Sequence, residues 1–459
     1  MPAIHEFTAA QISSAYSRGE LSPRDVTGAL LARINSWERR INAMYRIDAA
    51  GAMAAAAAAE ARWRAGAPLS ALDGVPVTIK ENIRTRGDPS PIGTRANEAA
   101  APEHDDAPPA ARLRDAGCVI LGKTTMPDYG MLSSGVSSLH GVTRNPWRHD
   151  LNPSGSSSGA AAACAARYAP LHAGTDIGGS LRLPAAHCGV FAFKPSLGRV
   201  PIHPPYMGRV AGPITRTVAD AVLMMQVLAR PDPRDFMALP PQDLDFSAQT
   251  TQFRIGLLTD MEAGLAVAPE VRSAVEGAAK ALAATGCAVE PVRSFLTEEM
   301  LDGMCRFFEA RSHEEISSLP AARRQKVLPF IAEWCTWRAA RFSGAEVMRA
   351  YGAVMAMREA AVKASRAYDF LLCPVSPVVS YPAEWASPTN DPRRALEHIA
   401  FTVPFSMSEQ PAASLHWSAS AEGLPLGIQL VGRRFDDAGV LRLAQFIEAQ
   451  RPAQRPWPE

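Results

Sequence analysis

The sequence predicts an α/β fold, and two observations carry that prediction. Two short segments rich in β-branched residues, 75–79 and 118–121, flank a helix-like stretch at 108–116 that ends near Gly117. A strand, a helix and a second strand in this order are typical of parallel strands in an α/β sheet. Strand-like segments also recur later in the chain, at 255–258, 370–372 and 427–431.

Helices are expected at both ends of this pattern. Ser22 and Pro23 form an N-cap and a first helical residue, and apolar residues then recur on one face from Val26 to Ile34. The alanine run at 49–61 has high intrinsic helix propensity. Residues 298–367 are predicted to be mostly helical, with aromatic side chains that suit either a core or a substrate wall.

The bulk properties indicate a globular protein with a sizeable core. Of its 459 residues, 47% are hydrophobic and 20% are charged. The formal net charge of +1 gives no general electrostatic reason to bind nucleic acid or an anionic membrane. The first 20 residues lack the apolar run of a signal peptide, and no apolar run reaches about 18 residues, so no membrane span is expected.

The cysteines point to a reducing compartment. Seven are scattered through the chain without the spacing of a disulfide framework or a metal site. We therefore expect buried free thiols, a cytoplasmic protein and no bound metal.

Three short segments carry the chemistry: 79–82, 153–159 and 174–180. They supply a lysine at the end of an apolar strand, a serine-rich turn, and a second serine after paired glycines. Serine is a poor nucleophile until a base takes its proton, and a buried lysine can be that base because desolvation favours its neutral form. Paired glycines also let successive N–H groups converge on one point, as an oxyanion hole requires.

Each segment also has a plainer interpretation. Lys80 alone fits a strand-end lysine that reaches water, and Gly178-Gly179 alone fits a turn. Gly155-x-Ser157-x-Gly159 matches the nucleophile-elbow pattern, which would make Ser157 the nucleophile. An elbow follows directly on a strand, whereas 148–153 is typical of a loop, so the elbow is disfavoured. Phosphate binding is disfavoured as well, because the glycine patterns of nucleotide loops are missing.

Taken in order along the chain, these segments resemble the amidase signature family of serine hydrolases. The resemblance rests on the segments 74–82, 153–159 and 174–184 and on the separation of 24 residues between Ser156 and Ser180. Further segments agree with the family as well, at 121–127, 143–147, 188–190, 194–200 and 423–432.

The resemblance implies a fold and a set of roles. The fold would be a central mixed β-sheet with α-helices on both faces. Ser180 would be the nucleophile and Lys80 the base, and Ser156, beside a cis peptide bond, would relay the proton between them. The N–H groups of Ile177, Gly178, Gly179 and Ser180 would form the oxyanion hole.

The resemblance also implies a domain plan. The whole chain, 1–459, would be one domain. Its parts would be N-terminal helices at 1–65, a signature core at 66–231, a variable substrate-pocket region at 232–400 and a C-terminal core segment at 401–459.

Substrate contacts are less clear from the sequence. Glu81 stands where many family members have aspartate, the serine loop departs from the commoner glycine-rich form, and Leu415-His416-Trp417 replaces a frequent leucine-proline segment. Ser157, Arg182 and Trp417 are the candidates for contacting substrate. Arg182 could bind a substrate carboxylate, or it could brace the nucleophile loop through Asp176. Trp417, with His416, could line the pocket or pack in the core.

Three functions follow as hypotheses. The first is a stand-alone amidase that hydrolyses a small carboxamide to an acid and ammonia or an amine. The second is the glutaminase subunit of an aminoacyl-tRNA amidotransferase, which would need partner subunits. The third is a non-catalytic scaffold that retains the fold. The expected partner is a small-molecule amide, with no cofactor, nucleic acid or membrane, and a homodimer is expected from the family alone.

Overall fold

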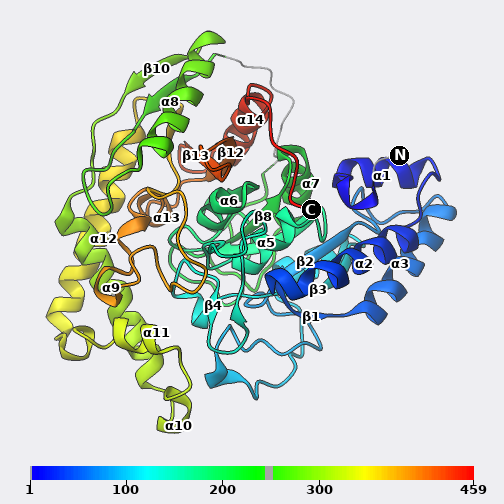
Figure 1. Ribbon diagram of the computed structural model, residues 1–459, viewed down its shortest axis with the longest axis horizontal. Helices are drawn as coiled ribbons and strands as arrows, with labels where there is room; N and C mark the ends of the chain where they lie inside the picture. Colours follow the sequence, from blue (N-terminus) through cyan, green and yellow to red (C-terminus); the bar gives the residue numbers. More distant parts are fainter. Residues whose placement is uncertain (1–2, 243–251) are drawn as a thin grey trace.

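A computed structural model of the protein describes residues 3–242 and 252–459 (Figure 1). Its centre is an eleven-stranded mixed sheet in the order β1-β3-β2-β6-β8-β7-β12-β13-β11-β9-β10. The strands of this sheet are β1 (Met44–Ile47), β2 (Pro76–Lys80), β3 (Val119–Thr124), β6 (Leu171–Asp176), β7 (Phe191–Lys194), β8 (Val210–Thr215), β9 (Arg254–Leu257), β10 (Ala288–Pro291), β11 (Phe370–Pro374), β12 (Ala412–Ala419) and β13 (Pro425–Gly432). Two further short strands, β4 (Val136–Ser137) and β5 (Gly141–Val142), pair with each other.

The parallel pairing predicted for the first two strands is confirmed. β2 pairs in parallel with β3 on one side and with β6 on the other. β6 then pairs antiparallel with β8, and β12 antiparallel with both β7 and β13. The sheet is therefore mixed, and β2 lies inside it.

Helices flank the sheet on both faces, as predicted. They are α1 (Ala9–Ser17), α2 (Pro23–Ile41), α3 (Ala49–Arg64), α4 (Pro108–Asp115), α5 (Ser158–Ala165), α6 (Arg182–Cys188), α7 (Val218–Leu228), α8 (Pro269–Ala284), α9 (Glu298–Ser317), α10 (Ala321–Arg324), α11 (Pro329–Trp334), α12 (Gly344–Ser365), α13 (Val403–Met407) and α14 (Asp437–Glu448).

The alternation along β7 shows how the two faces are filled. Phe191 and Phe193 pack in one hydrophobic cluster with residues of α7 and α14. Ala192, between them, packs in a second cluster with residues of α5 and α6. Successive side chains of a strand point to opposite faces, so α5 and α6 cover one face and α7 and α14 the other.

The predicted helix start at Ser22 has the expected cap. The Ser22 hydroxyl accepts a hydrogen bond from the N–H of Asp25 at 3.1 Å, and Pro23 is the first helical residue. The apolar face of α2, from Val26 to Ile41, is buried. Capping and a buried apolar stripe together explain why this segment folds as a helix.

Residues 298–367 are mostly helical, as predicted, and form a separate wall. α9 packs along α12, and Figure 1 shows this pair with α10 and α11 along one edge of the molecule. Its side chains Met304, Phe308, Trp334 and Met357 pack in a hydrophobic cluster that also includes Leu371 of β11. Across residues 3–242 and 252–459, no helix combines the length and the apolar character that crossing a membrane requires.

Candidate active site

Lys80 ends β2, an interior strand of the sheet, and is completely buried. Its ammonium group donates to three hydroxyls: Ser156 Oγ at 2.8 Å, Ser157 Oγ at 3.0 Å and Thr175 Oγ1 at 3.0 Å. Burial lowers the pKa of Lys80 to about 7, although the nearby carboxylates of Asp176 and Glu81 oppose that shift. A lysine with this pKa exchanges its proton near neutral pH, which suits a general base.

The serine-rich turn reaches Lys80 from the loop before α5. The peptide bond between Gly155 and Ser156 is cis. A Cβ at Gly155 would lie 2.5 Å from the carbonyl oxygen of Ser134, so no larger residue fits at this position. The loop therefore runs tightly against its neighbour, which places the Ser156 hydroxyl next to the lysine.

Ser157 serves a different purpose from Ser156. Its hydroxyl accepts from Lys80 and donates to the carbonyl oxygen of Thr175 at 3.1 Å, and the side chain is completely buried. The elbow pattern needs a strand directly before the serine, and no strand lies between β5 and Ser157. The backbone N–H of Ser157 donates to the carbonyl oxygen of Ser180 at 3.2 Å, which ties the two serine loops together.

Ser180 lies in the loop that follows β6, and the carboxylate of Asp176 shapes that loop. Asp176 accepts hydrogen bonds from the N–H of Gly179 at 2.8 Å and of Leu181 at 3.0 Å. Gly179 has a φ of +131°, and a Cβ there would lie 2.6 Å from the Thr402 hydroxyl oxygen. Only glycine meets both conditions at this position.

This geometry leaves fewer N–H donors for the oxyanion hole than the sequence predicts. The N–H of Gly179 already donates to Asp176, so it is not free to bind an oxyanion. In the part of the chain that the structure describes, the N–H groups of Ile177, Gly178 and Ser180 have no hydrogen-bond acceptor. Three of the four predicted donors are therefore open.

Arg182 braces the loop that carries Ser180, and it does not line the pocket over the serines. It is fully buried and pairs with Asp176, at 3.0 Å to each carboxylate oxygen. It also donates to the carbonyl oxygen of Thr402 at 2.9 Å, to Ser406 at 2.7 Å and to Gln429 at 2.7 Å. With all its donors engaged inside the protein, Arg182 has none left for a substrate carboxylate. Arg182 holds the pKa of Asp176 at about 2 against the opposing effect of burial, so the loop carboxylate stays ionised.

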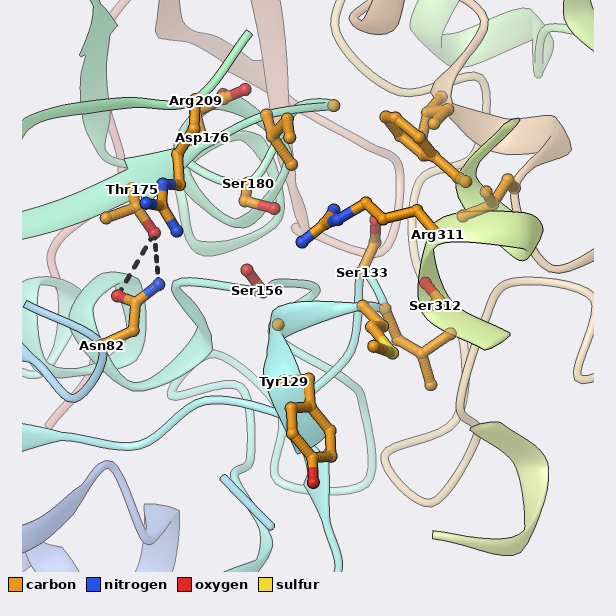
Figure 2. A pocket seen from close by; sticks show the side chains of 18 of the residues that line it. Asn82, Tyr129, Ser133, Ser156, Thr175, Asp176, Ser180, Arg209, Arg311 and Ser312 are labelled. Carbon is orange, nitrogen blue, oxygen red and sulfur yellow. Dashed lines mark hydrogen bonds between the residues drawn. The ribbon is translucent and has the colours of Figure 1, made fainter. Parts of the chain in front are cut away.

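A pocket opens over the two serines (Figure 2). Ser156 and Ser180 both line it, together with Ile177 and Gly178 of the loop after β6. The opposite side is built from α9, α11 and the short helical turn Glu397–Ile399. The side chains contributed from there are Phe308, Arg311, Ser312, Trp334, Leu396 and Ile399.

Trp417 lies elsewhere. It lines a separate surface depression with Pro269, Glu270 and Ala274 of α8, and a Cβ at Gly277 of the same helix would lie 3.5 Å from its ring nitrogen. The Trp417 side chain therefore belongs to the packing between β12 and α8, and it does not reach the pocket over the serines. His416 is buried as well, and burial lowers its pKa to about 4.

Four site residues were not singled out from the sequence. Thr175 is the third acceptor for Lys80, and Asn82 donates to its hydroxyl at 3.1 Å (Figure 2). Both lie within segments already noted for Lys80 and Ser180, so their neighbourhood was a usable signal. Arg209 and Arg311 also line the pocket, but nothing in their local sequence sets them apart from other surface arginines.

A family model described as Amidase matches residues 25–441. Among curated proteins, the chain is 32% identical to the glutamyl-tRNA(Gln) amidotransferase A-subunit from Myxococcus xanthus, over 97% of this chain and 98% of the relative. The corresponding protein from Chloroflexus aggregans is 34% identical, over 98% of this chain and 97% of that protein.

Solved structures extend the comparison. A bacterial aryl acylamidase described as an amidase signature enzyme superposes with a TM-score of 0.88 at 28% identity, covering 98% of this chain and 97% of the other. A 6-aminohexanoate cyclic dimer hydrolase gives a TM-score of 0.84 at 26% identity, covering 99% and 98%.

Proposed function

The chain belongs to the amidase family, and from that premise we propose that it cleaves a carboxamide C–N bond through an acyl-enzyme formed on Ser180. The observation that carries the proposal is the buried lysine. Lys80 donates to the hydroxyl of Ser156 at 2.8 Å and has a pKa of about 7, and Ser156 lines the same pocket as Ser180. A base, a relay and a nucleophile are thereby available at one end of the sheet.

The proposed reaction begins with neutral Lys80. It takes a proton from Ser156 while Ser156 takes the proton of Ser180, whose oxygen attacks the amide carbon. The open N–H groups of Ile177, Gly178 and Ser180 stabilise the negative charge that develops on the carbonyl oxygen. The proton then returns along the same relay to the leaving nitrogen. Water hydrolyses the ester on Ser180 to release the acid.

The test is amide turnover measured beside a serine variant. Ammonia or amine release is followed over a panel of glutamine, aliphatic amides, aryl amides and anilides, with Ser180→Ala in parallel. Turnover that depends on Ser180 supports the proposal. Turnover that survives Ser180→Ala would contradict it. Silence over the whole panel, without labelling of Ser180 by a serine-directed phosphonate, would favour the non-catalytic scaffold.

A narrower function is favoured by the sequence comparisons. The matched subunits of glutamyl-tRNA(Gln) amidotransferases align with this chain over almost its whole length at 32–34% identity. We therefore place glutaminase activity within an amidotransferase ahead of a stand-alone amidase. It predicts ammonia release from glutamine that rises when partner subunits are added. Efficient hydrolysis of aryl or aliphatic amides without partners, and none of glutamine, would favour the stand-alone enzyme instead.

A further inference from the structure

We infer that His140 is a positioning residue for the proposed base: it keeps the carboxylate of Glu81 ionised near Lys80 and thereby sets the pH at which Lys80 becomes neutral. The inference deepens the proposed function and rests on it. It gives a role to a histidine that does not line the pocket over the serines and that the catalytic steps do not use.

The contact between Glu81 and His140 is buried and specific. The side chain of Glu81 has no exposed surface, and that of His140 is 10% exposed. In residues 3–242 and 252–459, the Glu81 carboxylate accepts hydrogen bonds from one side chain, since His140 Nε2 lies 3.1 Å from each of its oxygens. An ionised carboxylate only accepts hydrogen bonds, so the ring nitrogen is the donor. A buried carboxylate without a donor takes up a proton instead, so His140 decides the charge of Glu81.

The short hairpin of β4 and β5 holds His140 in this position. The N–H of His140 donates to the Ser137 hydroxyl at 2.9 Å, and its carbonyl oxygen accepts from the Asn42 amide at 2.7 Å. Its imidazole ring stacks on the ring of Tyr45, with 4.8 Å between the ring centres and 23° between the planes. The backbone and the stacking therefore fix the ring independently of Glu81, and the ring in turn fixes the carboxylate.

Glu81 acts on Lys80 by its charge and not by a contact. The three hydrogen bonds of Lys80 all go to hydroxyls, and the described residues show no ion pair between Lys80 and Glu81. Both side chains are fully buried, where little water screens one charge from another. Burial lowers the pKa of Lys80 to about 7, and the carboxylates of Asp176 and Glu81 oppose that shift. The charge of Arg209 has a smaller effect, in the same direction as burial. If Glu81 were neutral, Lys80 would therefore lose its proton at a lower pH.

Asp176 is the other carboxylate that acts on Lys80, and its charge is secured differently. It pairs with Arg182, at 3.0 Å to each of its oxygens, and an arginine stays charged at any working pH. Glu81 depends instead on a histidine, a residue that can change its charge near neutral pH. Of the two carboxylates, Glu81 is thus the one whose charge can be altered without dismantling the loop that carries Ser180.

Other charged groups near the pair are engaged elsewhere. They are Arg46 of β1, Lys123 of β3, and Asp88, Glu103 and Asp106 of the segment between β2 and α4. Arg46 pairs with Asp88, Asp106 pairs with Arg114, and Lys123 donates to Thr85 at 2.9 Å. Beside the hairpin, Asp128 accepts from the N–H and the hydroxyl of Ser138. Within the described part of the chain, none of these groups makes a hydrogen bond or an ion pair with Glu81 or His140.

The test reads the charge of Lys80 without a substrate. The chain has six lysines, so protein labelled with ¹³C at lysine Cε gives few NMR signals, and the signal missing from Lys80→Arg protein belongs to Lys80. Its chemical shift against pH gives the titration midpoint of Lys80 in the full chain. His140→Phe keeps an aromatic ring against Tyr45 but removes the donor. We expect it to lower the midpoint by about half a pH unit or more, because Glu81 becomes neutral.

A double substitution shows whether the effect passes through Glu81. Glu81→Gln alone should lower the midpoint, and adding His140→Phe to it should cause no further change. His140→Gln keeps an N–H donor and should retain most of the original midpoint. His149→Phe is the matched control, because His149 also lies against an aromatic ring, that of Trp37, and should leave the midpoint unchanged. Thermal melting of each variant checks that it folds.

Two results would overturn the inference. One is a midpoint that stays the same or rises in His140→Phe. The other is a fall that adding His140→Phe still produces in the Glu81→Gln background. If His140→Phe does not fold, Glu81→Asp decides in its place: it withdraws the carboxylate from His140 by one methylene and should lower the midpoint equally, and an unchanged midpoint would overturn the inference.

The titration also separates this inference from the proposed function. Failure of the proposed function is the absence of Ser180-dependent turnover from every amide tested, and it leaves the midpoint of Lys80 measurable. If turnover is found, the rise of kcat/KM with pH should move with that midpoint in each variant. A rise that stays in place while the midpoint moves would overturn the role of His140 in the reaction.

Discussion

The two sides of the pocket differ in how deeply their polar side chains are buried and in how many hydrogen bonds these side chains make. On the sheet side, Lys80, Ser157 and Arg182 are completely buried and each makes several hydrogen bonds inside the protein. On the helical side, Arg311 is partly exposed, and its closest carboxylate lies 4.0 Å away. The side chains proposed for chemistry are therefore held in place by several hydrogen bonds, whereas Arg311 has few contacts of this kind inside the protein. Substitutions should therefore act on rate on one side and on substrate choice on the other.

The largest expected effect comes from two neighbouring serine positions on the sheet side. Ser180→Ala should lower kcat/KM at least about 10⁴-fold because it removes the proposed nucleophile. Ser157→Ala removes hydrogen bonds to Lys80 and Thr175 and should cost about tenfold or less. Steady-state kinetics on the best amide of the panel measures both. The reverse order of the two losses would establish Ser157 as the nucleophile.

The paired glycines offer the next contrast. Gly179→Ala forces a side chain into a left-handed backbone and against Thr402, which should destabilise the fold by about 1–3 kcal/mol and cost most activity. At Gly178 a Cβ would meet its nearest neighbour, Ile399, at 3.4 Å, which is ordinary contact. Gly178→Ala should therefore melt normally and raise KM for bulky amides. Thermal melting and kinetics of both variants test this, and equal loss of stability would refute the assigned difference.

The pH profile probes the lysine directly. Because Lys80 acts when it is neutral and its pKa is about 7, kcat/KM should rise about tenfold per pH unit below pH 7 and level off above it. Glu81 raises the pKa of Lys80, so Glu81→Gln should move this rise to lower pH. Profiles of both proteins between about pH 5 and 9, in the same buffer series, provide the measurement. A flat profile would count against Lys80 as the limiting base.

The smallest expected effect lies on the helical side. Phe308 lines the pocket from α9, and Phe308→Leu keeps an apolar surface while changing its shape. The ratio of kcat/KM for aryl over aliphatic amides should shift by about tenfold or less, with little change in the pH profile. An equal fall for every amide, together with a displaced pH profile, would mean that the two sides of the pocket are not separable.

Local sequence was enough to predict much of the sheet. The segments predicted at 75–79 and 118–121 correspond to β2 and β3, and those at 370–372 and 427–431 to β11 and β13. By contrast, β6 and β8 were not singled out, because residues with low strand propensity lie at their centres: Ala173-Gly174 in β6 and Ala211-Gly212-Pro213 in β8. Their pairing with each other and with β2 and β7 overrides that local preference.

The site divides in the same way. Lys80, Ser156 and Ser180 stand in recognisable motifs, and local order was sufficient to select them. Arg209 and Arg311 come from separate parts of the chain, and only tertiary packing places both on Tyr206. The sequence makes Trp417 a candidate for substrate contact because the segment around it departs from the family pattern. In the structure, however, the face of β12 that carries Trp417 packs against α8. The face of the sheet to which a side chain points depends on the register of its strand, and the sequence around Trp417 is not enough to predict that register.

The brace on the nucleophile loop has a consequence for synthesis of the chain. Lys80, Ser156 and Ser180 leave the ribosome early, but Arg182 finds three of its acceptors 220, 224 and 247 residues later, in Thr402, Ser406 and Gln429. Until those residues are made, Arg182 lacks these three hydrogen-bond acceptors, and its ion pair with Asp176 is not held in place. A nascent chain therefore carries the three proposed catalytic residues before their loop is complete, and we expect the proposed activity to appear only in the last sixth of translation, which includes Thr402.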